Sequence, residues 1–354
     1  MEKLKIGVIG AGAIARRGHL PTLLGMRDVK IVGIAELDDS TRREVASEFS
    51  IKNHYADYRE LLNAESLNVV DICTPPQTHL EIIKAAAEKG IHVLVEKPLT
   101  LSWPDTCQIE KAVRASGIKF SVVQNYRYFP EIIRVKNRIE QGYLGRIVTM
   151  HGLGLIRFPG QWTRSRWLYH PGGTLYDYGP HLIDLLLWLN ESRPLKVYAA
   201  GGDITGGDMG FINYAENDSE FENKAIATAE ISWLTGTLNL TIDIHGTGGH
   251  IYLDVRSDTY AEVHGFATPF DDLRAFLKRM LKISRGVFND RYFKGALLYY
   301  EPLFSDFFNA VKQNTAPPVS IDEAVMVSAV LEAAHRSITL KRPVLMDELL
   351  GKTE

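Results

Sequence analysis

The first third of the chain alternates short β-branched, apolar runs with segments of helical periodicity, and this alternation constrains the fold most strongly. The predicted strands are residues 4–9, 30–35, 68–73, 91–95 and 119–123. The predicted helices between them are residues 13–24, 41–49, 78–88 and 104–116. Strands that alternate with helices indicate βαβ units, a parallel sheet and right-handed crossovers. We therefore expect an α/β fold.

The pattern changes after about residue 126. A predicted helix at 130–141 is followed by longer alternating segments at 147–156, 195–201, 224–233, 237–245, 250–255 and 260–264, and by helices at 299–313 and 321–338. Alternation of this kind predicts an antiparallel sheet whose second face is covered by helices or by a neighbouring subunit. A chain of 354 residues suits two domains. We predict a dinucleotide-binding domain at 1–125 and an α+β domain with a large, mostly antiparallel, open sheet at 126–354.

Composition excludes several classes of protein. The net charge of −3 gives no support to nucleic-acid binding. The two cysteines cannot by themselves form a disulfide framework or a zinc site, so we expect no metal and a reduced, cytoplasmic compartment. No apolar run approaches the roughly 20 residues that span a bilayer, and residues 1–5 run directly into a strand rather than a signal peptide.

A glycine-rich turn follows the first predicted strand and opens a helix; residues 10–15 read GAGAIA. Small residues serve the tight turn, the approach of a pyrophosphate to the backbone, and close packing of the helix on its strand. The amides at the start of the helix then face the phosphates. The expected cofactor residues here are Gly10, Gly12, Ala13, Ile14 and Glu36. The alternative is an ordinary tight turn between strand and helix.

Glu36 ends the second predicted strand, where a carboxylate accepts hydrogen bonds from both ribose hydroxyls. A 2′-phosphate would meet the charges of Glu36, Asp38 and Asp39. The nearest cations, Arg42 and Arg43, lie one turn into the next helix and could swing back. We therefore favour NAD over NADP.

Two further passages suggest chemistry, each with a plainer alternative. Lys97 follows the strand at 91–95, so it lies at a strand's carboxyl end, where ligands bind in open α/β sheets; a surface lysine before a chain-breaking proline is equally consistent. His181 falls in the first turn of a helix that Gly179 and Pro180 begin. The positive end of the helix dipole disfavours imidazolium there, which suits a general base. Asp177 could fix its tautomer, or the two residues could form only a local cap.

The ordered combination of these motifs resembles the glucose–fructose oxidoreductase/inositol dehydrogenase (Gfo/Idh/MocA) family, from Leu4 to about Val344. The motifs that carry the resemblance are the glycine turn, Cys73-Thr74-Pro75, Glu96-Lys97-Pro98, Asn125-Tyr126-Arg127, and Gly172-Gly173 through Asp177 and His181. It implies a Rossmann domain along which NAD(P) lies, with the nicotinamide facing a pocket on the second domain's sheet.

The resemblance also implies roles for individual residues. Lys97, Asp177 and His181 would be the catalytic set for hydride exchange at a sugar or cyclitol carbinol. Lys97 would polarise the substrate oxygen, His181 would remove or return the hydroxyl proton, and Asp177 would orient His181. The Lys97–Pro98 peptide could be cis. The other residues implied near the cofactor are Thr74, Pro75, Glu96 and Asn125, and those near the substrate are Arg127, Trp162, Arg164, Arg166 and Trp167. A surface loop with aromatic anchors is the alternative for residues 161–167.

Residues 270–295 depart from the family pattern and are rich in arginine and lysine. Apolar residues at helical spacing predict an amphipathic helix whose cationic face includes Arg274 and Arg285. A solvated surface helix, a wall over an anionic substrate such as a nucleotide sugar, and attachment to an acidic membrane surface all remain open.

The leading functional hypothesis is an NAD(P)-dependent oxidoreductase that acts on a secondary hydroxyl of a sugar, cyclitol or sugar derivative. The alternatives are a hidden redox cycle on tightly bound NAD, which hydrolyses glycosides or exchanges oxidation between sugars, and a non-catalytic dinucleotide sensor. We expect a small-molecule sugar or polyol partner and a homodimer or homotetramer.

Overall fold

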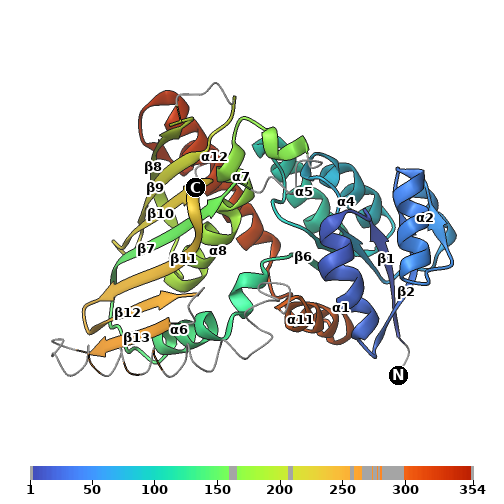
Figure 1. Ribbon diagram of the computed structural model, residues 1–354, viewed down its shortest axis with the longest axis horizontal. Coiled ribbons are helices and arrows are strands. Elements are labelled where there is room, and N and C mark those ends of the chain that lie inside the picture. Colours follow the sequence, from blue (N-terminus) through green and yellow to red (C-terminus); the bar gives the residue numbers. More distant parts are fainter. Residues whose placement is uncertain are drawn as a thin grey trace. The chain divides into compact units, whose positions relative to one another are not determined.

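The computed structural model describes residues 3–158, 166–205, 210–255, 259–264, 273, 277, 280 and 299–351. The chain forms two compact units (Figure 1). The first comprises Met1–Asn125 and Ala296–Ser328, and the second comprises Tyr126–Gly295 and Ala329–Glu354. The predicted boundary at residue 125 coincides with the end of the first segment. Residues 296–328, which we predicted within the second domain, belong to the first unit.

The first unit contains a parallel six-stranded sheet with strand order β3-β2-β1-β4-β5-β6, the order of a Rossmann fold. Its strands are β1 (Leu4–Ile9), β2 (Val29–Ala35), β3 (His54–Tyr55), β4 (Val69–Ile72), β5 (His92–Val95) and β6 (Phe120–Val122). The five predicted strands are confirmed to within one or two residues. The sequence analysis missed β3, because two residues are too short to carry an alternating pattern.

The helices of the first unit start and end at recognisable residues. They are η1 (Ala15–His19), α1 (Leu20–Gly25), α2 (Asp39–Glu48), α3 (Tyr58–Ala64), η2 (Pro76–Thr78), α4 (His79–Glu88), α5 (Trp103–Ser116) and α11 (Tyr300–Gln313). The Asp38 carboxylate accepts a hydrogen bond from the Thr41 amide at 2.7 Å and caps α2. Gly117, at φ 67°, ends α5 in the left-handed conformation that glycine adopts without strain.

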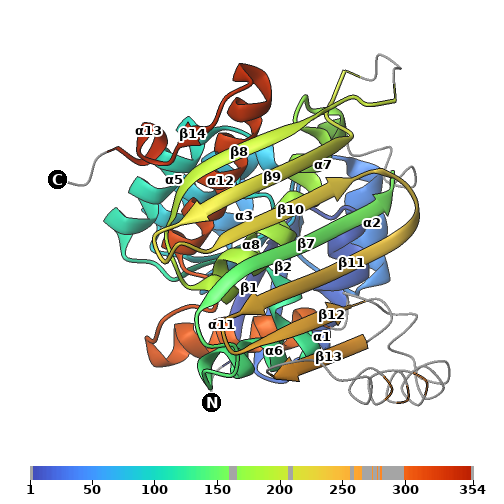
Figure 2. The same cartoon turned by 90° about the vertical axis from the view of Figure 1, so that its left-hand side faces the viewer.

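The second unit contains an eight-stranded sheet with strand order β13-β12-β11-β7-β10-β9-β8-β14 (Figure 2). Its strands are β7 (Ile147–Arg157), β8 (Pro194–Gly202), β9 (Tyr214–Phe221), β10 (Ile226–Ser232), β11 (Leu234–Gly246), β12 (Gly249–Asp254), β13 (Thr259–His264) and β14 (Val344–Leu345). Only the β7–β10 pair is parallel among the strand pairs of this sheet that the structure describes, so the predicted mostly antiparallel sheet is confirmed.

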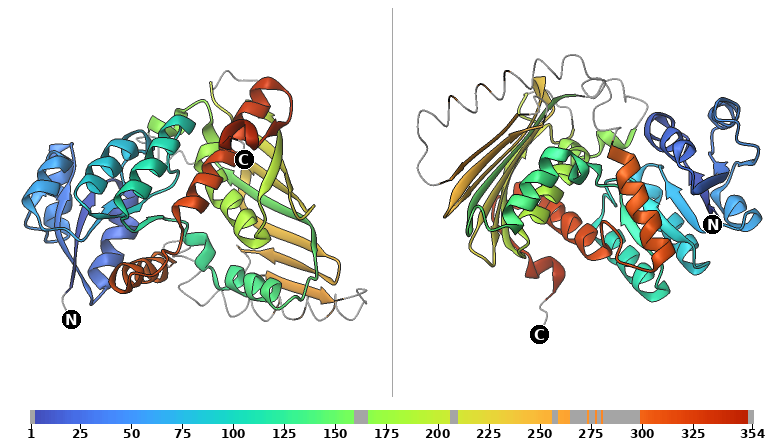
Figure 3. Two further views of the ribbon diagram at one scale, coloured as in Figure 1. Left: turned by 180° about the vertical axis from the view of Figure 1, so that it is seen from behind. Right: turned by 90° about the horizontal axis from the view of Figure 1, so that it is seen from below.

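Helices cover one face of this sheet (Figure 3). The helical segments of the unit are η3 (Asn125–Tyr128), which begins at the unit boundary, α6 (Pro130–Glu140), η5 (Arg166–Tyr169), α7 (Gly173–Asp177), α8 (Gly179–Asn190), α12 (Ile321–Leu340), whose first residues belong to the first unit, and α13 (Asp347–Leu350). The described part of this unit places no helix on the other face, which we call the open face.

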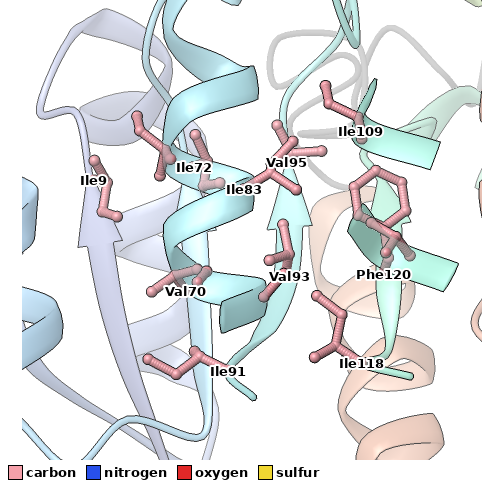
Figure 4. Close-up of a cluster of buried hydrophobic side chains, with 14 of the residues drawn as sticks. Ile9, Val70, Ile72, Ile83, Ile91, Val93, Val95, Ile109, Ile118 and Phe120 are labelled. Carbon is pink, nitrogen blue, oxygen red and sulfur yellow. The ribbon is translucent and has the colours of Figure 1, made fainter. Parts of the chain in front are cut away.

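The core of the first unit lies between the parallel sheet and the helices that pack on it, along the whole length of the strands. Isoleucine and valine side chains of β1, β4 and β5 interdigitate with those of α4 and α5 (Figure 4). Strands that are buried on both faces read as continuous apolar runs, which is why the sequence predicted them well. No helix in the described part of the chain is both long enough and apolar enough to cross a membrane.

Candidate active site

Four of the sequence motifs lie at the edge of the first sheet where its strands have their carboxyl ends. Backbone hydrogen bonds extend the strand ladder beyond the strand ends: Gly10 N donates to Ala35 O at 2.8 Å, and Cys73 N donates to Ile9 O at 2.7 Å. Glu96 N donates to Ile72 O at 2.9 Å. The residues after β1, β2, β4 and β5 therefore lie side by side along one edge, where open α/β sheets bind their ligands.

The glycine turn has the shape that a dinucleotide needs. Gly10 has φ +92°, and a Cβ there would come within 2.9 Å of the backbone of Cys73 and Thr74. A Cβ on Gly12 would meet nothing within 4 Å, so the backbone there is open to a ligand. Ala13 and Ile14 follow in the first helical turn, before the π-helical segment η1. The turn thus combines a tight reversal with an accessible helix start, where backbone amides favour phosphate.

Glu36 is held against this turn. Its carboxylate accepts hydrogen bonds from the amides of Ala11 at 2.8 Å and Asp38 at 3.1 Å. Arg42 donates to the carbonyl oxygen of Glu36 at 2.8 Å and pairs with Asp39. Arg43 also pairs with Asp39, at 2.9 Å. Both nearby cations therefore have the same anionic partner, Asp39.

His79 ties together the loops that follow β4 and β5. Its ring nitrogens lie 2.9 Å from the carbonyl oxygens of Thr74 and Leu99. Burial lowers the pKa of His79, and the hydrogen bonds to the two carbonyl oxygens partly oppose this shift. This bridge fixes Thr74, which is half-buried, beside the exposed ring of Pro75.

Sequence reasoning did not place His19 and Asp71 in the site, but they form a buried cluster with Glu96. His19 Nδ1 lies 2.8 Å from Asp71 Oδ2, and His19 Nε2 lies 2.8 Å from Glu96 Oε1. His19 and Asp71 are fully buried and Glu96 is nearly so. The hydroxyl of Tyr300 donates to Glu96 at 3.3 Å. Only the pairing of β4 with β5 brings these acids to either side of one imidazole.

The charges in this cluster stabilise one another. Burial opposes a charged His19, but the charge and hydrogen bond of Asp71, with help from Cys73, outweigh it and raise the pKa of His19 well above its usual value. Burial alone would raise the pKa of Glu96, but the hydrogen bond and charge of His19 lower it. Burial raises the pKa of the Cys73 thiol to about 12. The opposite shifts of His19 and Glu96 both favour the charged form of the group, so these two side chains stabilise each other's charge.

Lys97 is the next residue in the chain after Glu96 of this cluster. The second carboxylate oxygen of Glu96 accepts a hydrogen bond from the Lys97 amide at 3.0 Å. Lys97 is half-buried, and its peptide bond to Pro98 is cis, as the family resemblance allowed. The backbone of the lysine is thus anchored to a rigid charged group while its side chain remains partly exposed.

In the second unit, α7 ends at Asp177 and α8 begins at Gly179, which confirms the predicted helix start. His181 is buried in the first turn of α8. Its ring stacks on Tyr126 with centroids 4.1 Å apart and planes 8° apart, and Tyr178 meets it edge-on at 5.8 Å. Tyr126 belongs to a motif that supported the family resemblance, yet we had assigned it no role. Two aromatic rings thus fix the plane of the imidazole.

Arg127 and Asp184 form a buried bidentate ion pair within the second unit. Arg127 Nε donates to Asp184 Oδ2 at 2.8 Å, and a terminal nitrogen donates to Oδ1 at 2.6 Å. The pair joins η3 to α8, the helix that carries His181. The predicted contact of Arg127 with substrate stays a prediction.

The other predicted site residues fall in different surroundings. Asn125 is buried at the end of the first segment, and Trp167 packs beside Leu168, Phe211 and Trp233. Trp162, Arg164 and the side chain of Arg166 lie outside the described residues. In the predicted basic helix, the structure describes Leu273, Leu277 and Met280, which are helical and about half exposed. Arg274 and Arg285 lie outside the described residues.

The strand order and the glycine turn define a class of protein, the Rossmann-fold dinucleotide-binding proteins. Residues 4–124 match the family model described as "Oxidoreductase family, NAD-binding Rossmann fold", and residues 132–252 match "GFO/IDH/MocA C-terminal domain". The chain belongs to the Gfo/Idh/MocA family and is an NAD(P)-dependent dehydrogenase acting on CH–OH groups.

Two relatives illustrate this membership, and one solved structure shares the fold. Levoglucosan dehydrogenase from Pseudarthrobacter phenanthrenivorans is 30% identical over 318 residues, which cover 78% of this chain and 80% of that protein. Myo-inositol 2-dehydrogenase from Thermotoga maritima is 25% identical over 358 residues, which cover 98% of this chain and 100% of that protein. The structure of the WlbA dehydrogenase from Bordetella pertussis, solved with NADH and UDP-GlcNAcA, has a TM-score of 0.82 at 20% identity and covers 97% of this chain and 98% of that one.

Proposed function

We propose that the protein oxidises a secondary hydroxyl of a sugar, cyclitol or sugar derivative and passes the hydride to NAD. The observation that carries the proposal is the position of Lys97 on the same sheet edge as the open Gly12 backbone and the Glu36 carboxylate. An ammonium group at the edge where the cofactor binds is suited to hold the oxygen of the carbon that is oxidised. The named substrates of two relatives, levoglucosan and myo-inositol, are polyhydroxylated rings of this kind.

Each catalytic residue has a definite task in this proposal. Bound NAD supplies the hydride acceptor. Lys97 binds the substrate oxygen and stabilises the negative charge that develops on it when the proton leaves. His181 accepts that proton, and Asp177 holds the orientation of His181. Lys97 lies in the first unit, and Asp177 and His181 lie in the second.

NAD is the proposed cofactor because of the charge near the ribose site. A 2′-phosphate beside Glu36 would meet the carboxylates of Asp38 and Asp39 as well. Arg42 and Arg43, which could compensate, already pair with Asp39. The ordinary acceptor for ribose hydroxyls is a carboxylate in the position of Glu36.

The remaining residues of the proposed site follow the family resemblance. Thr74, Pro75, Glu96 and Asn125 would line the cofactor groove. The proposed substrate contacts are Arg127, Trp162, Arg164, Arg166 and Trp167.

The test is formation of NADH across a panel of polyols, aldoses, anhydrosugars and UDP-sugars, with the wild type and a Lys97→Ala variant. We expect turnover with at least one ring polyol or sugar, and a loss of at least about 100-fold in kcat for Lys97→Ala, because general acid–base and charge-stabilising groups each contribute 10²-fold or more.

Lys84→Ala removes an exposed lysine of α4 and is the matched control. Binding of NAD, measured by calorimetry, should be nearly unchanged in both variants. Undiminished turnover in Lys97→Ala would refute the assigned role, and failure of the whole panel would refute the proposed substrate class.

A further inference from the structure

Three side chains that can bind metal ions converge on the open face of the second sheet. Asp243 and His245 alternate along β11 with Ile242 and Ile244, which are fully buried on the opposite, helix-covered face. His250 of β12 pairs directly with His245 in the strand register. Because side chains alternate between the faces of a sheet, Asp243, His245 and His250 all project from the open face.

Their ligand atoms lie close together. His250 Nε2 lies 2.5 Å from Asp243 Oδ1, and His245 Nε2 lies 3.3 Å from the same oxygen. The two imidazole rings are stacked, with centroids 4.3 Å apart and planes 11° apart, so their Nε2 atoms share one edge. All three ligand atoms fall within 4.8 Å of one another. A third imidazole, that of His151 on β7, lies beside the group with its ring centroid 6.5 Å from that of His245.

We propose that Asp243, His245 and His250 form a binding site for a divalent transition-metal ion, with Zn²⁺ as the ion of choice. Two imidazole nitrogens and one carboxylate are a donor set that zinc takes from proteins when it keeps a further position for water. Donors around a tetrahedral zinc lie roughly 3.3 Å apart, given bond lengths of about 2.0–2.2 Å. His245 Nε2 and Asp243 Oδ1 already lie 3.3 Å apart.

The donor set also selects against other cations. Mg²⁺ and Ca²⁺ prefer oxygen ligands, and this site offers a single carboxylate beside two nitrogens. A single carboxylate oxygen can accept hydrogen bonds from both imidazoles, and this is the alternative that the titration below tests. A cation between the three groups satisfies all of them at once.

The backbone that carries the ligands is fixed before any ion binds. A short turn joins β11 to β12, and its amides bond to a neighbouring segment: Thr247 N donates to Arg146 O at 2.9 Å, and Gly248 N donates to Leu144 O at 2.8 Å. Gly246 lies so close to that segment that a Cβ would come within 2.1 Å of Leu144 O. A hairpin fixed in this way loses little entropy when its side chains bind an ion. The bound ion would cross-link β11 to β12.

The site is tested with the full chain, prepared without a histidine tag, stripped with a chelator and titrated with Zn²⁺ by calorimetry. We expect one Zn²⁺ per chain. The variants His245→Ala and His250→Gln should each bind at least about tenfold more weakly, because each loses one of three ligands. His54→Ala removes an exposed histidine of β3 and should bind like the wild type. Mg²⁺ should produce no binding heat.

Thermal melting gives a second, independent readout. Zn²⁺ should raise the melting temperature of the wild type, because an ion that binds only the folded state stabilises it, and should raise that of His250→Gln much less. Circular dichroism confirms that the variants fold. Absence of Zn²⁺ binding by the wild type, or equal binding by wild type, His245→Ala and His250→Gln, would overturn the proposal. Neither result would bear on the proposed dehydrogenase activity, which uses none of these residues.

Discussion

At the scale of single residues, the proposed preference for NAD depends on Glu36. Its carboxylate is already held by the amides of Ala11 and Asp38, so it meets the ribose as a fixed acceptor. Replacing it by glutamine removes a charged acceptor, and hydrogen bonds to charged groups contribute about 1.5–3 kcal/mol. We expect Glu36→Gln to raise the KM for NAD about 10- to 100-fold. The variant should also prefer NAD over NADP less strongly than the wild type does. Steady-state kinetics with NAD and with NADP measures both effects. Glu88→Gln, which alters an exposed carboxylate of α4, is the control. An unchanged KM would contradict the assignment.

The second prediction at this scale concerns His19, whose contribution to the stability of the folded state should depend on pH. The folded state raises its pKa, so its contribution to stability is complete below the ordinary histidine pKa of about 6.5 and is lost as pH rises through the higher folded value. We expect His19→Gln to lower the melting temperature markedly at pH 6.5, because two buried carboxylates lose their shared cation. The difference in melting temperature from the wild type should shrink as the pH rises through the folded pKa of His19.

Two measurements separate this role from simple packing. Melting temperatures of wild type and His19→Gln, measured over a series of pH values from 6 upwards, should draw closer as the pH rises, whereas a difference that is constant with pH would count against the charged cluster. Because Glu96 bonds the Lys97 amide, we also expect kcat of His19→Gln to fall more than its affinity for NAD.

At the scale of elements, the Arg127–Asp184 pair fixes η3 against α8. Removing one member of a buried ion pair leaves an uncompensated charge and costs about 3–5 kcal/mol. We expect Asp184→Ala to destabilise the protein by that amount, and the double variant Arg127→Met with Asp184→Leu to recover most of it. Chemical denaturation measures both. A double variant that is as unstable as Asp184→Ala would contradict this explanation of the loss of stability. A KM for substrate that rises in the double variant, but not in Asp184→Ala, would support the predicted contact of Arg127 with substrate.

The elements also show which features a sequence can predict. Continuous apolar runs predicted β1, β4 and β5, because both faces of these strands are buried. Strand β9 was missed because Glu216, Asn217, Asp218 and Glu220 make it polar, although its buried positions alternate regularly with exposed ones. Short parallel strands bring their ends to one edge, so motif order along the chain was enough to place the glycine turn beside Glu36 and Lys97.

Contacts that depend on strand pairing could not be predicted. His19 and Asp71 are far apart in sequence and meet Glu96 only because β4 lies beside β5. The group formed by Asp243, His245 and His250 likewise depends on the register of β11 with β12, since a shift of one residue would move a histidine to the other face. Sequence periodicity predicts that a strand exists, but its register follows from turn geometry and packing.

At the scale of the whole molecule, the open face of the second sheet leads us to expect a homo-oligomer. Tyr198 of β8 and Ile226 of β10 project from this face and are 44% and 45% exposed in the single chain. Apolar side chains on an otherwise uncovered sheet favour pairing with a second copy. Light scattering should give a mass at least twice that of one chain for the wild type. The double variant Tyr198→Arg with Ile226→Arg should dissociate, because it places unpaired charges in the interface. Leu24→Arg alters an equally exposed apolar residue of α1 and should keep the wild-type mass. A monomeric wild type, or a double variant that stays assembled, would show that this face does not hold the copies together.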